Sequence, residues 1–402
     1  MFLLTLAVVA SIGTVVFLFA RGYRFSPGTR KLSANGILVA KSNPDGAQLF
    51  LNGELETATN ATINLEPGDY DVEIKKEGYK TWVKRVVVEK EVVTELNANL
   101  FKSAPSLVPI TFNSVETPTA SSGFSKILFV VPATIENVAE DLEGLWLLET
   151  LNLPIGFNQG PKRVTDGNLT GATFTFSPNE REVLFQTAIG SFLVDLATFT
   201  PQSKRVNIVA TQEELLAEWQ EEESTKLIAR LRKLPTELND ILMASGSKVF
   251  LSPDEEKVLY LAGTDGDLPD GLIPELPGSS TQKEERNIAS QGIYVYDIKE
   301  DRNFKVGEQS IPQSSACITN QSVIYLACDA TISWYPTSLN LLLASPNSIS
   351  VLDYDGANNQ SVYSGSFVAP YAFSTNSPDR IIFLTNLGAN STEANLYSLT
   401  VR

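Results

Sequence analysis

The sequence contains no histidine and only two cysteines among its 402 residues. Without imidazole, the chain lacks the usual proton acceptor near neutral pH, every Ser-His-Asp or Cys-His nucleophilic site, and every metal site that uses histidine. Cys317 and Cys328 are too few to build a cysteine-rich zinc or iron site within one chain. Chemistry that depends on these groups is therefore excluded.

Basic residues are also scarce, since 31 Lys and Arg stand against 47 Asp and Glu, for a net charge of −16. A chain this acidic is repelled by nucleic-acid backbones, so we expect no nucleic-acid partner. No G-x-S-x-G elbow, P-loop or dinucleotide fingerprint is present. We predict that the protein is not an enzyme and uses no cofactor and no metal. A glycosidase built on two carboxylates stays open, because no spacing selects a pair.

Charge is absent from one further stretch, residues 2–20, which read FLLTLAVVASIGTVVFLFA. As a helix rising ~1.5 Å per residue this run covers about 28 Å, close to the roughly 30 Å of a bilayer core. We predict a transmembrane anchor over residues 1–22, followed by a basic stalk over residues 23–35. The alternatives are a buried helix and a cleaved signal peptide, but neither a charged segment before the run nor a small-x-small site after it is present.

The orientation of this anchor is contested by two arguments. Arg21, Arg24, Arg30 and Lys31 follow the apolar run, and the positive-inside rule places such residues in the cytoplasm. The modules further along the chain resemble extracytoplasmic ones. We expect a single-pass cell-membrane protein with most of the chain outside the cytoplasm.

Residues 36–101 alternate short strand-like runs with strong turn signals. Pro44, Asp45, Gly46 and Ala47 make one turn, and Asn52-Gly53 makes a tight hairpin. The stretches LEPGDY (residues 65–70) and EGY (residues 77–79) supply further turns between short strands. This pattern predicts a small antiparallel β-sandwich. Together these residues resemble the PEGA domain, a family whose presence implies envelope attachment or binding and no known catalysis. The six turn residues then have structural roles.

Beyond a Pro-, Ser- and Thr-rich segment, predicted as a linker over residues 102–124, the chain repeats. FSPNEREVLF (residues 176–185) and LSPDEEKVLY (residues 251–260) match position by position, with weaker copies at residues 334–343 and 376–384. Asp195 follows Pro178 at the same spacing as Asp353 follows Pro336. A third copy carries a loop-like insertion, residues 263–292.

The repeated unit is a turn, a strand, a hairpin and a strand that ends in Asp. It resembles a blade of a TolB-like or WD40-like β-propeller. We therefore predict an all-β protein with a β-propeller over residues 125–402, interrupted by a helical hairpin over residues 211–246, where apolar residues recur at helical spacing. A pair of β-sandwiches is the alternative.

Two groups of side chains have a possible further role. Cys317 and Cys328 could form a disulfide if the domain is extracytoplasmic, or be small buried hydrophobic residues if it is not. The acidic stretches 264–271 and 353–359 offer oxygen ligands suited to calcium, but a hairpin turn requires the same residues, and we expect no metal there.

These features predict a membrane-anchored, extracytoplasmic, non-catalytic binding or scaffold protein of the prokaryotic cell envelope. Its ligand would be a protein, a peptide or a glycan, because a repeated β-architecture offers a concave face and a central channel. The alternatives are a hydrolase or lyase acting on envelope glycans, and a purely structural envelope spacer.

Overall fold

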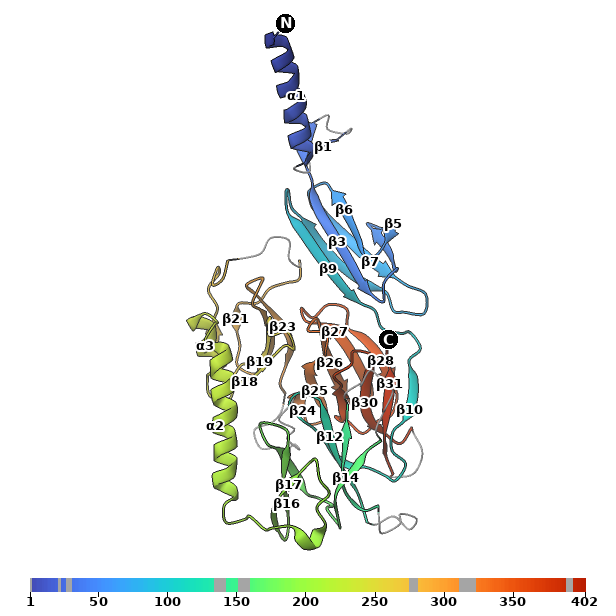
Figure 1. Cartoon of the computed structure of the whole chain (residues 1–402), viewed down its shortest axis with the longest axis vertical. Helices are drawn as coiled ribbons and strands as arrows, with labels where there is room; N and C mark the ends of the chain where they lie inside the picture. Colours follow the sequence, from blue (N-terminus) through green and yellow to red (C-terminus); the bar gives the residue numbers. More distant parts are fainter. Residues whose placement is uncertain are drawn as a thin grey trace. The chain divides into compact units, whose positions relative to one another are not determined.

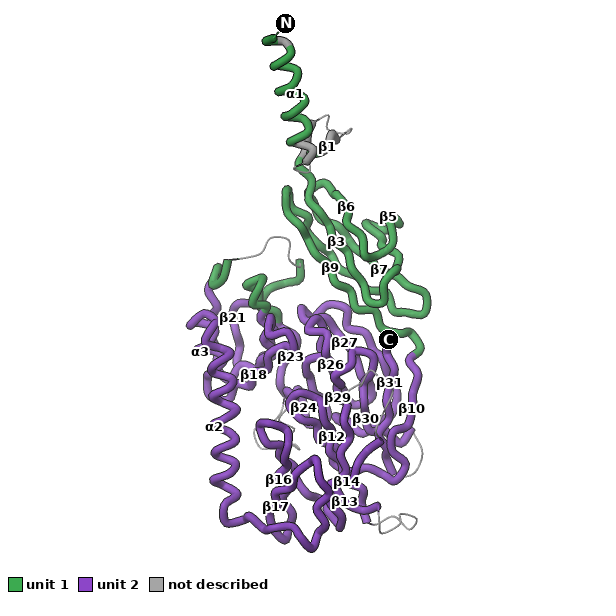
Figure 2. The backbone as a smooth tube through the Cα atoms, in the orientation of Figure 1, with its two compact units in different colours: residues 1–104, 270–284, 297–304 green, residues 105–269, 285–296, 305–402 purple. Residues whose placement is uncertain are grey.

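The computed structural model describes residues 2–20, 23–26, 31–133, 142–150, 160–274, 281–310, 323–387 and 393–402. These residues form mainly β-strands, with three α-helices among them (Figure 1). The chain divides into two compact units, which Figure 2 colours separately. Unit 1 comprises residues 1–104, 270–284 and 297–304, and unit 2 comprises residues 105–269, 285–296 and 305–402.

Unit 1 begins with helix α1 (Phe2–Ala20), formed by the charge-free run. The hydroxyls of Ser11 and Thr14 donate hydrogen bonds to carbonyls one turn earlier, each over 2.8 Å. Within the described part of the chain, none of the helices combines the length and the apolar character needed to cross a membrane. This corrects the predicted transmembrane anchor, whose 19 residues lay near the lower end of the roughly 17–25 that a spanning helix uses.

The remaining strands of unit 1 form one hairpin and two sheets. The hairpin pairs β1 (Tyr23–Ser26) with β2 (Lys31–Ala34). One sheet has the order β6-β3-β9, with β3 (Gly36–Asn43), β6 (Ala61–Leu65) and β9 (Val93–Asn99). The other has the order β5-β4-β7-β8, with β4 (Gln48–Leu51), β5 (Glu54–Ala58), β7 (Gly68–Lys75) and β8 (Trp82–Val88).

Alternating residues of both sheets fill a single core, which includes Leu38, Leu49, Ile74 and Trp82. This is the packing expected of period-two strands that bury one face. One pairing differs from the predicted antiparallel sandwich, because β3 runs parallel to β9. The chain builds the whole second sheet between these two strands, so the long crossover that a parallel pair requires is available.

The strands from β10 onward form five larger sheets and one two-stranded pair. Their bounds are β10 (Ser106–Pro109), β11 (Glu116–Ala120), β12 (Lys126–Val131), β13 (Gly144–Glu149), β14 (Lys162–Asp166), β15 (Thr173–Phe176), β16 (Glu182–Thr187), β17 (Gly190–Asp195), β18 (Lys248–Leu251), β19 (Lys257–Leu261), β20 (Gly266–Asp267), β21 (Asn287–Ile288), β22 (Gly292–Asp297), β23 (Arg302–Glu308), β24 (Ile324–Ala327), β25 (Ala330–Trp334), β26 (Asn340–Ser345), β27 (Ser348–Asp353), β28 (Gln360–Ser364), β29 (Ala372–Ser374), β30 (Arg380–Thr385) and β31 (Asn395–Thr400). The sheet orders are β10-β31-β30-β29, β11-β12-β13-β14, β15-β16-β17, β18-β19-β22-β23 and β24-β25-β26-β27-β28, with β20 paired to β21.

These sheets stay separate, and the described residues do not form the closed propeller that the repeats predicted. Each repeat fixes its own hairpin, because alternation and turn residues act locally, whereas closing a ring depends on packing between sheets that no single repeat encodes. The predicted spacing does recur in the hairpins. Glu182 faces Asp195 in one and Asn340 faces Asp353 in another.

Residues 102–124, predicted as a linker, contain two strands. β10 pairs with β31, the last strand of the chain, and β11 pairs with β12. Both strands were missed because their Pro and Thr residues interrupt the alternation of apolar and polar residues that predicts a strand. Pro109 lies in β10, which is an edge strand of its sheet, a place where the missing N–H of proline is tolerated.

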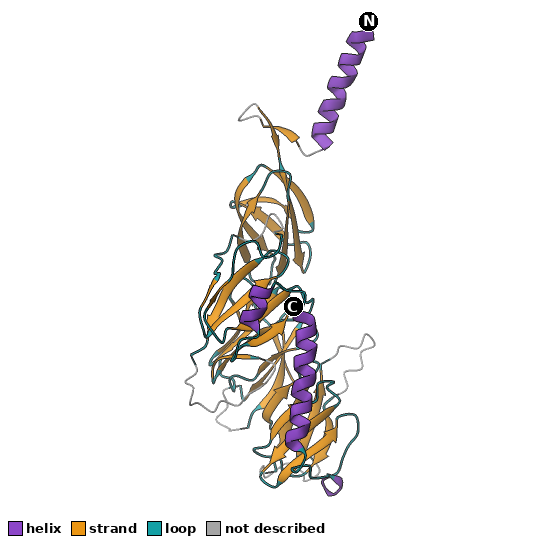
Figure 3. Ribbon diagram, turned by 90° about the vertical axis from the view of Figure 1, so that its left-hand side faces the viewer, coloured by secondary structure: helices purple, strands orange, loops and turns teal. Residues whose placement is uncertain are grey.

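Helices α2 (Gln212–Leu231) and α3 (Thr236–Leu242) lie within the segment where the sequence predicted a helical hairpin. A 3-10 turn, Gln202–Lys204, precedes them. α2 runs alongside the sheets of unit 2 (Figure 3). It buries only Trp219 and Leu231, whereas the shorter α3 buries Leu238, Ile241 and Leu242.

Candidate functional site

Four of the repeated turns in unit 2 share one backbone geometry. In each, the N–H of the fourth residue donates to the carbonyl of the first, and the N–H of the first donates to the carbonyl of the sixth. The fourth residues have positive φ angles: Phe124 (52°), Glu180 (55°), Glu255 (59°) and Ser338 (60°). A type I turn followed by a left-handed residue produces this pattern. The four turns are therefore equivalent in backbone structure, and three of them belong to the repeats seen in the sequence.

These turns meet at a cavity of about 560 Å³. Three of the four left-handed residues, Phe124, Glu180 and Glu255, line it. Trp334 and Asn376, from the last two repeats, complete the wall on the sheet side. Helix α2 contributes Leu227 and Arg230. Repeats that lie far apart in the sequence thus contribute to one site.

Glu180 is held by a dense set of donors. Its Oε1 accepts the backbone N–H of Gly123 over 3.0 Å, and its Oε2 accepts the Ser125 hydroxyl over 2.5 Å. Ser122 donates to Oε1 as well, over 3.2 Å. Burial by itself would raise the pKa of Glu180, but hydrogen bonds from Ser125, Gly123, Ser121 and Ser122 outweigh it and lower the pKa below its usual range. The carboxylate is therefore a fixed anion that joins two turns.

Glu255 occupies the same turn position but faces helix α2. Its Oε1 lies 3.4 Å from Nε of Arg230, and both side chains are more than half exposed. One helical turn earlier, Lys226 Nζ donates to the carbonyl of Pro178 over 3.4 Å. α2 therefore contacts two successive repeated turns, one through each basic side chain.

The remainder of the cavity wall is largely apolar. Strand β18 contributes Val249, Phe250 and Leu251. The indole Nε1 of Trp334 donates to the carbonyl of Phe250 over 2.9 Å, which fixes the ring against this strand. Asn376 is exposed at the wall. The cavity thus combines aromatic and aliphatic surface with an amide and with charged groups that are paired, which suits a ligand bound by shape and hydrogen bonds.

The six turn residues named from the sequence lie in unit 1. The Asn43–Pro44 bond is cis, and Gly46, Asn52 and Gly53 have φ angles of 65°, 50° and 84°. Ala47 is fully buried, and its N–H donates to Thr59 Oγ1 over 2.8 Å. The Asp45 carbonyl accepts a hydrogen bond from Lys76 Nζ. Each residue has a backbone role, and none of them lines the cavity of unit 2.

None of the other predicted groups that the structure describes lines the cavity. Cys317 lies outside the described residues, and Cys328, directly after β24, is not a free thiol, so the Cys317–Cys328 pair stays a prediction. The Asp353 carboxylate accepts hydrogen bonds from the side-chain amides of Asn340 and Asn358, over 2.9 and 2.8 Å. Within the described ranges, no group of three ligating side chains could hold a metal ion.

Sequence reasoning identified the repeated turns but not the cavity that they surround. The usable signal was the fourth turn position, where Glu180 and Glu255 recur in the two strongest copies. Arg230 and Leu227 carried no such signal, because helical spacing predicts a packed face without indicating which surface it packs on.

Comparison with known proteins gives limited matches. No curated protein matches the sequence. Among solved structures, the chain is similar to TolB from Agrobacterium tumefaciens (12% identity, 72% of this chain and 80% of that chain, TM-score 0.23) and to TolB from Acinetobacter baumannii (10%, 82% and 59%, 0.20). It is also similar to a luciferin-regenerating enzyme (9%, 74% and 97%, TM-score 0.28). At the level of sequence families, residues 35–104 match the PEGA domain.

Proposed function

We propose that this protein is a non-catalytic binding protein, and that the cavity of unit 2 is its ligand site for a peptide, a protein segment or a glycan. The observation that supports this is the convergence of equivalent turns on one cavity of about 560 Å³. A volume in this range is typical of ligand sites, and its aromatic wall offers faces on which sugar rings or apolar side chains pack.

A glycan hydrolase is the competing proposal, because two carboxylates, Glu180 and Glu255, line the same cavity. A glycosidase needs one carboxyl group with a raised pKa to donate a proton. The donors around Glu180 lower its pKa instead, and they occupy both of its oxygens. Glu255 is paired with Arg230. These surroundings favour binding over hydrolysis.

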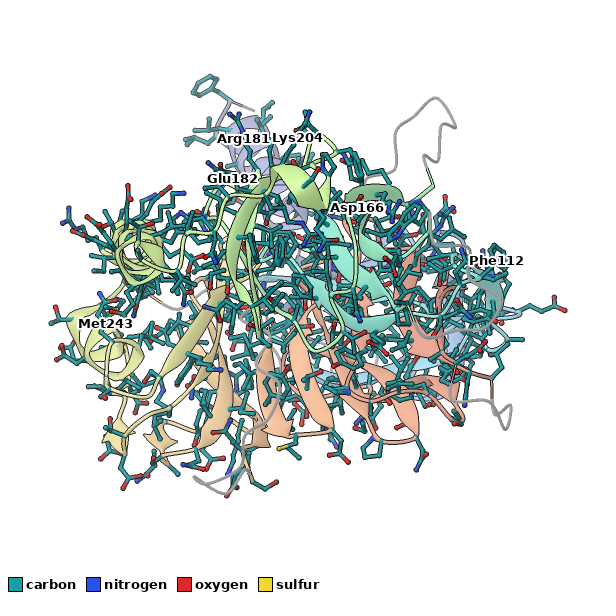
Figure 4. All side chains as sticks on the ribbon, turned by 90° about the horizontal axis from the view of Figure 1, so that it is seen from below. Phe112, Asp166, Arg181, Glu182, Lys204 and Met243 are labelled. Carbon is teal, nitrogen blue, oxygen red and sulfur yellow. The ribbon has the colours of Figure 1, made fainter. Side chains whose placement is uncertain are left out.

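The proposal is tested by screening the full chain against an oligosaccharide array and a random peptide library, and then filling the cavity. Asn376→Trp places a large ring at the wall. Lys204→Trp is the matched control, because Lys204 is exposed, does not line the cavity and lies at the outer edge of unit 2 in Figure 4. We expect Asn376→Trp to weaken binding of any compound retained by the wild type at least tenfold, and Lys204→Trp to leave it unchanged.

Two results would count against the proposal. Binding that survives Asn376→Trp would place the ligand site elsewhere. Hydrolysis of an array oligosaccharide by the wild type, lost in Glu180→Gln and Glu255→Gln, would make the cavity an active site.

The extracytoplasmic location stays a prediction. Labelling of Cys328 in intact cells with a membrane-impermeant thiol reagent, only after reduction, is the result expected for an outside location and a bonded cysteine. Labelling only after lysis, without reductant, would place the domain in the cytoplasm.

A further inference from the structure

The repeated turns of unit 2 contact one another directly at three places. Glu180 reaches back to the turn at residues 121–126, as described above. The Ser338 hydroxyl accepts the N–H of Asp254 over 3.0 Å, and the Tyr335 hydroxyl donates to the carbonyl of Pro378. In two of these three contacts, a left-handed fourth residue binds the preceding turn.

At the turn at residues 252–257, the left-handed fourth residue contacts a helix. Glu255, which holds the position of Glu180 and Ser338, binds Arg230 of α2. Lys226 of the same helix binds the other turn, at Pro178. Helix α2 therefore contacts both turns and borders the cavity between these contacts.

The attachment of α2 to these turns is weak. Between residues 220 and 230 every side chain of the helix is exposed except Leu227, which is partly buried. The Arg230–Glu255 pair is exposed at both ends, and pairs of this kind contribute about 0–1 kcal/mol. The firm anchors lie elsewhere, at Trp219 and at the buried cluster that begins with Leu231 and continues through α3. The middle of the helix is thus held over the cavity by contacts that water and salt can replace.

We infer that α2 is a movable cover that controls entry to the cavity: loss of the Arg230–Glu255 and Lys226–Pro178 contacts opens the gap between the turns at residues 177–182 and 252–257. The inference rests on the proposed function for its biological meaning, since the cover would regulate that binding site. Its physical content is independent of any ligand, because it concerns the accessibility of the cavity wall.

Accessibility is measured by the alkylation rate of a cysteine placed in the wall. Val249→Cys puts a thiol on β18, where Val249 lines the cavity. Val183→Cys, in a fully buried core position of β16, reports unfolding of the unit instead. Maleimide labelling of the full chain with each added cysteine, without reductant so that Cys328 stays unreactive, compares entry to the cavity with opening of the core.

Charge reversal at the cover gives the decisive variant. We expect Arg230→Glu to speed labelling of the cysteine at position 249 about fivefold, the factor that corresponds to about 1 kcal/mol for an exposed pair, without changing the rate at position 183. The swap Arg230→Glu with Glu255→Arg should restore the slow rate. The control reversal Lys162→Glu, which breaks the exposed Lys162–Glu149 pair on β14 and β13, should have no effect.

An unchanged rate at position 249 in Arg230→Glu would overturn the inference. So would equal acceleration at both positions, since that result means general destabilisation. Neither outcome bears on the array screen, and a failed screen leaves the labelling result unaffected, so the two proposals fail separately.

Discussion

Glu180 and Glu255 hold the same place in two repeated turns, yet their carboxylates meet different surroundings. Glu180 accepts hydrogen bonds from three groups of the neighbouring turn, whereas Glu255 makes one exposed ion pair with Arg230. Hydrogen bonds to a charged acceptor contribute about 1.5–3 kcal/mol, and exposed ion pairs about 0–1 kcal/mol. Glu180 should therefore contribute more to the free energy of unfolding than Glu255 does, although both residues have the same backbone conformation.

We expect Glu180→Gln to lower the free energy of unfolding by about 1–2 kcal/mol, because the amide keeps one acceptor oxygen but loses the charge that binds the other donors. Glu255→Gln is the matched control, with the same left-handed backbone, and should cost less than about 0.5 kcal/mol. Urea denaturation at pH 7 measures both. Equal losses would mean that the donors around Glu180 contribute nothing beyond the turn itself.

The lowered pKa of Glu180 also predicts how the stability of the folded state changes with pH. A carboxyl group whose pKa is lower in the folded state stabilises that state above its unfolded pKa of about 4.3, and this contribution disappears as the pH falls through the folded value. The difference in stability between wild type and Glu180→Gln should therefore be full at pH 6 and should shrink steadily as the pH falls below about 4.3. Thermal melts across this range measure it, and a difference that grows with acidity would contradict the assignment.

Among the secondary-structure elements, those defined by local signals were the ones that the sequence predicted. Pro, Gly and Asn located the turns of unit 1, and the recurrent Pro-containing turns located the hairpins of β16–β17 and β26–β27. The parallel β3–β9 pair, the strands β10 and β11, and the absence of ring closure in the described residues were missed. The β3–β9 pair and β10 depend on partners distant in sequence, and strand periodicity does not identify a partner. β11 pairs with the next strand, but its Pro- and Thr-rich sequence lacks strand alternation.

Close approach between elements gives a second stability test. A Cβ at Gly36, at the start of β3, would overlap the backbone carbonyl of Glu89, whereas one at Gly53 would meet nothing within 4 Å. Gly53 needs its positive φ of 84°. We expect Gly36→Ala to cost about 2–3 kcal/mol through displacement of backbone, and Gly53→Ala about 1 kcal/mol through conformational strain alone. Chemical denaturation gives both values, and a Gly53→Ala cost at or above that of Gly36→Ala would contradict this ranking.

Among the described residues, one buried cluster lies in unit 1 and two others lie in unit 2. The unit 1 core, which contains Ile74, and the unit 2 core around Phe185 are separate clusters. Both side chains are fully buried, so truncation of either leaves a cavity in its own cluster. A chain with separate cores need not unfold in one step, so local protection of backbone amides is a better measure than a single midpoint.

We expect Ile74→Ala to lower the opening free energy of amides in β7 and β8 by about 2–5 kcal/mol, and Phe185→Ala to lower that of amides in β16 and β17 by about 3–5 kcal/mol. Because the clusters share no residue, the double variant should show each loss in its own strands, additive within about 0.5 kcal/mol. Leu128→Ala with Phe185→Ala, within one cluster, is the coupled control and should deviate from additivity. Hydrogen exchange measures all of these variants. If Ile74→Ala lowered protection in β16 as much as in β7, the two cores would act as one cooperative unit.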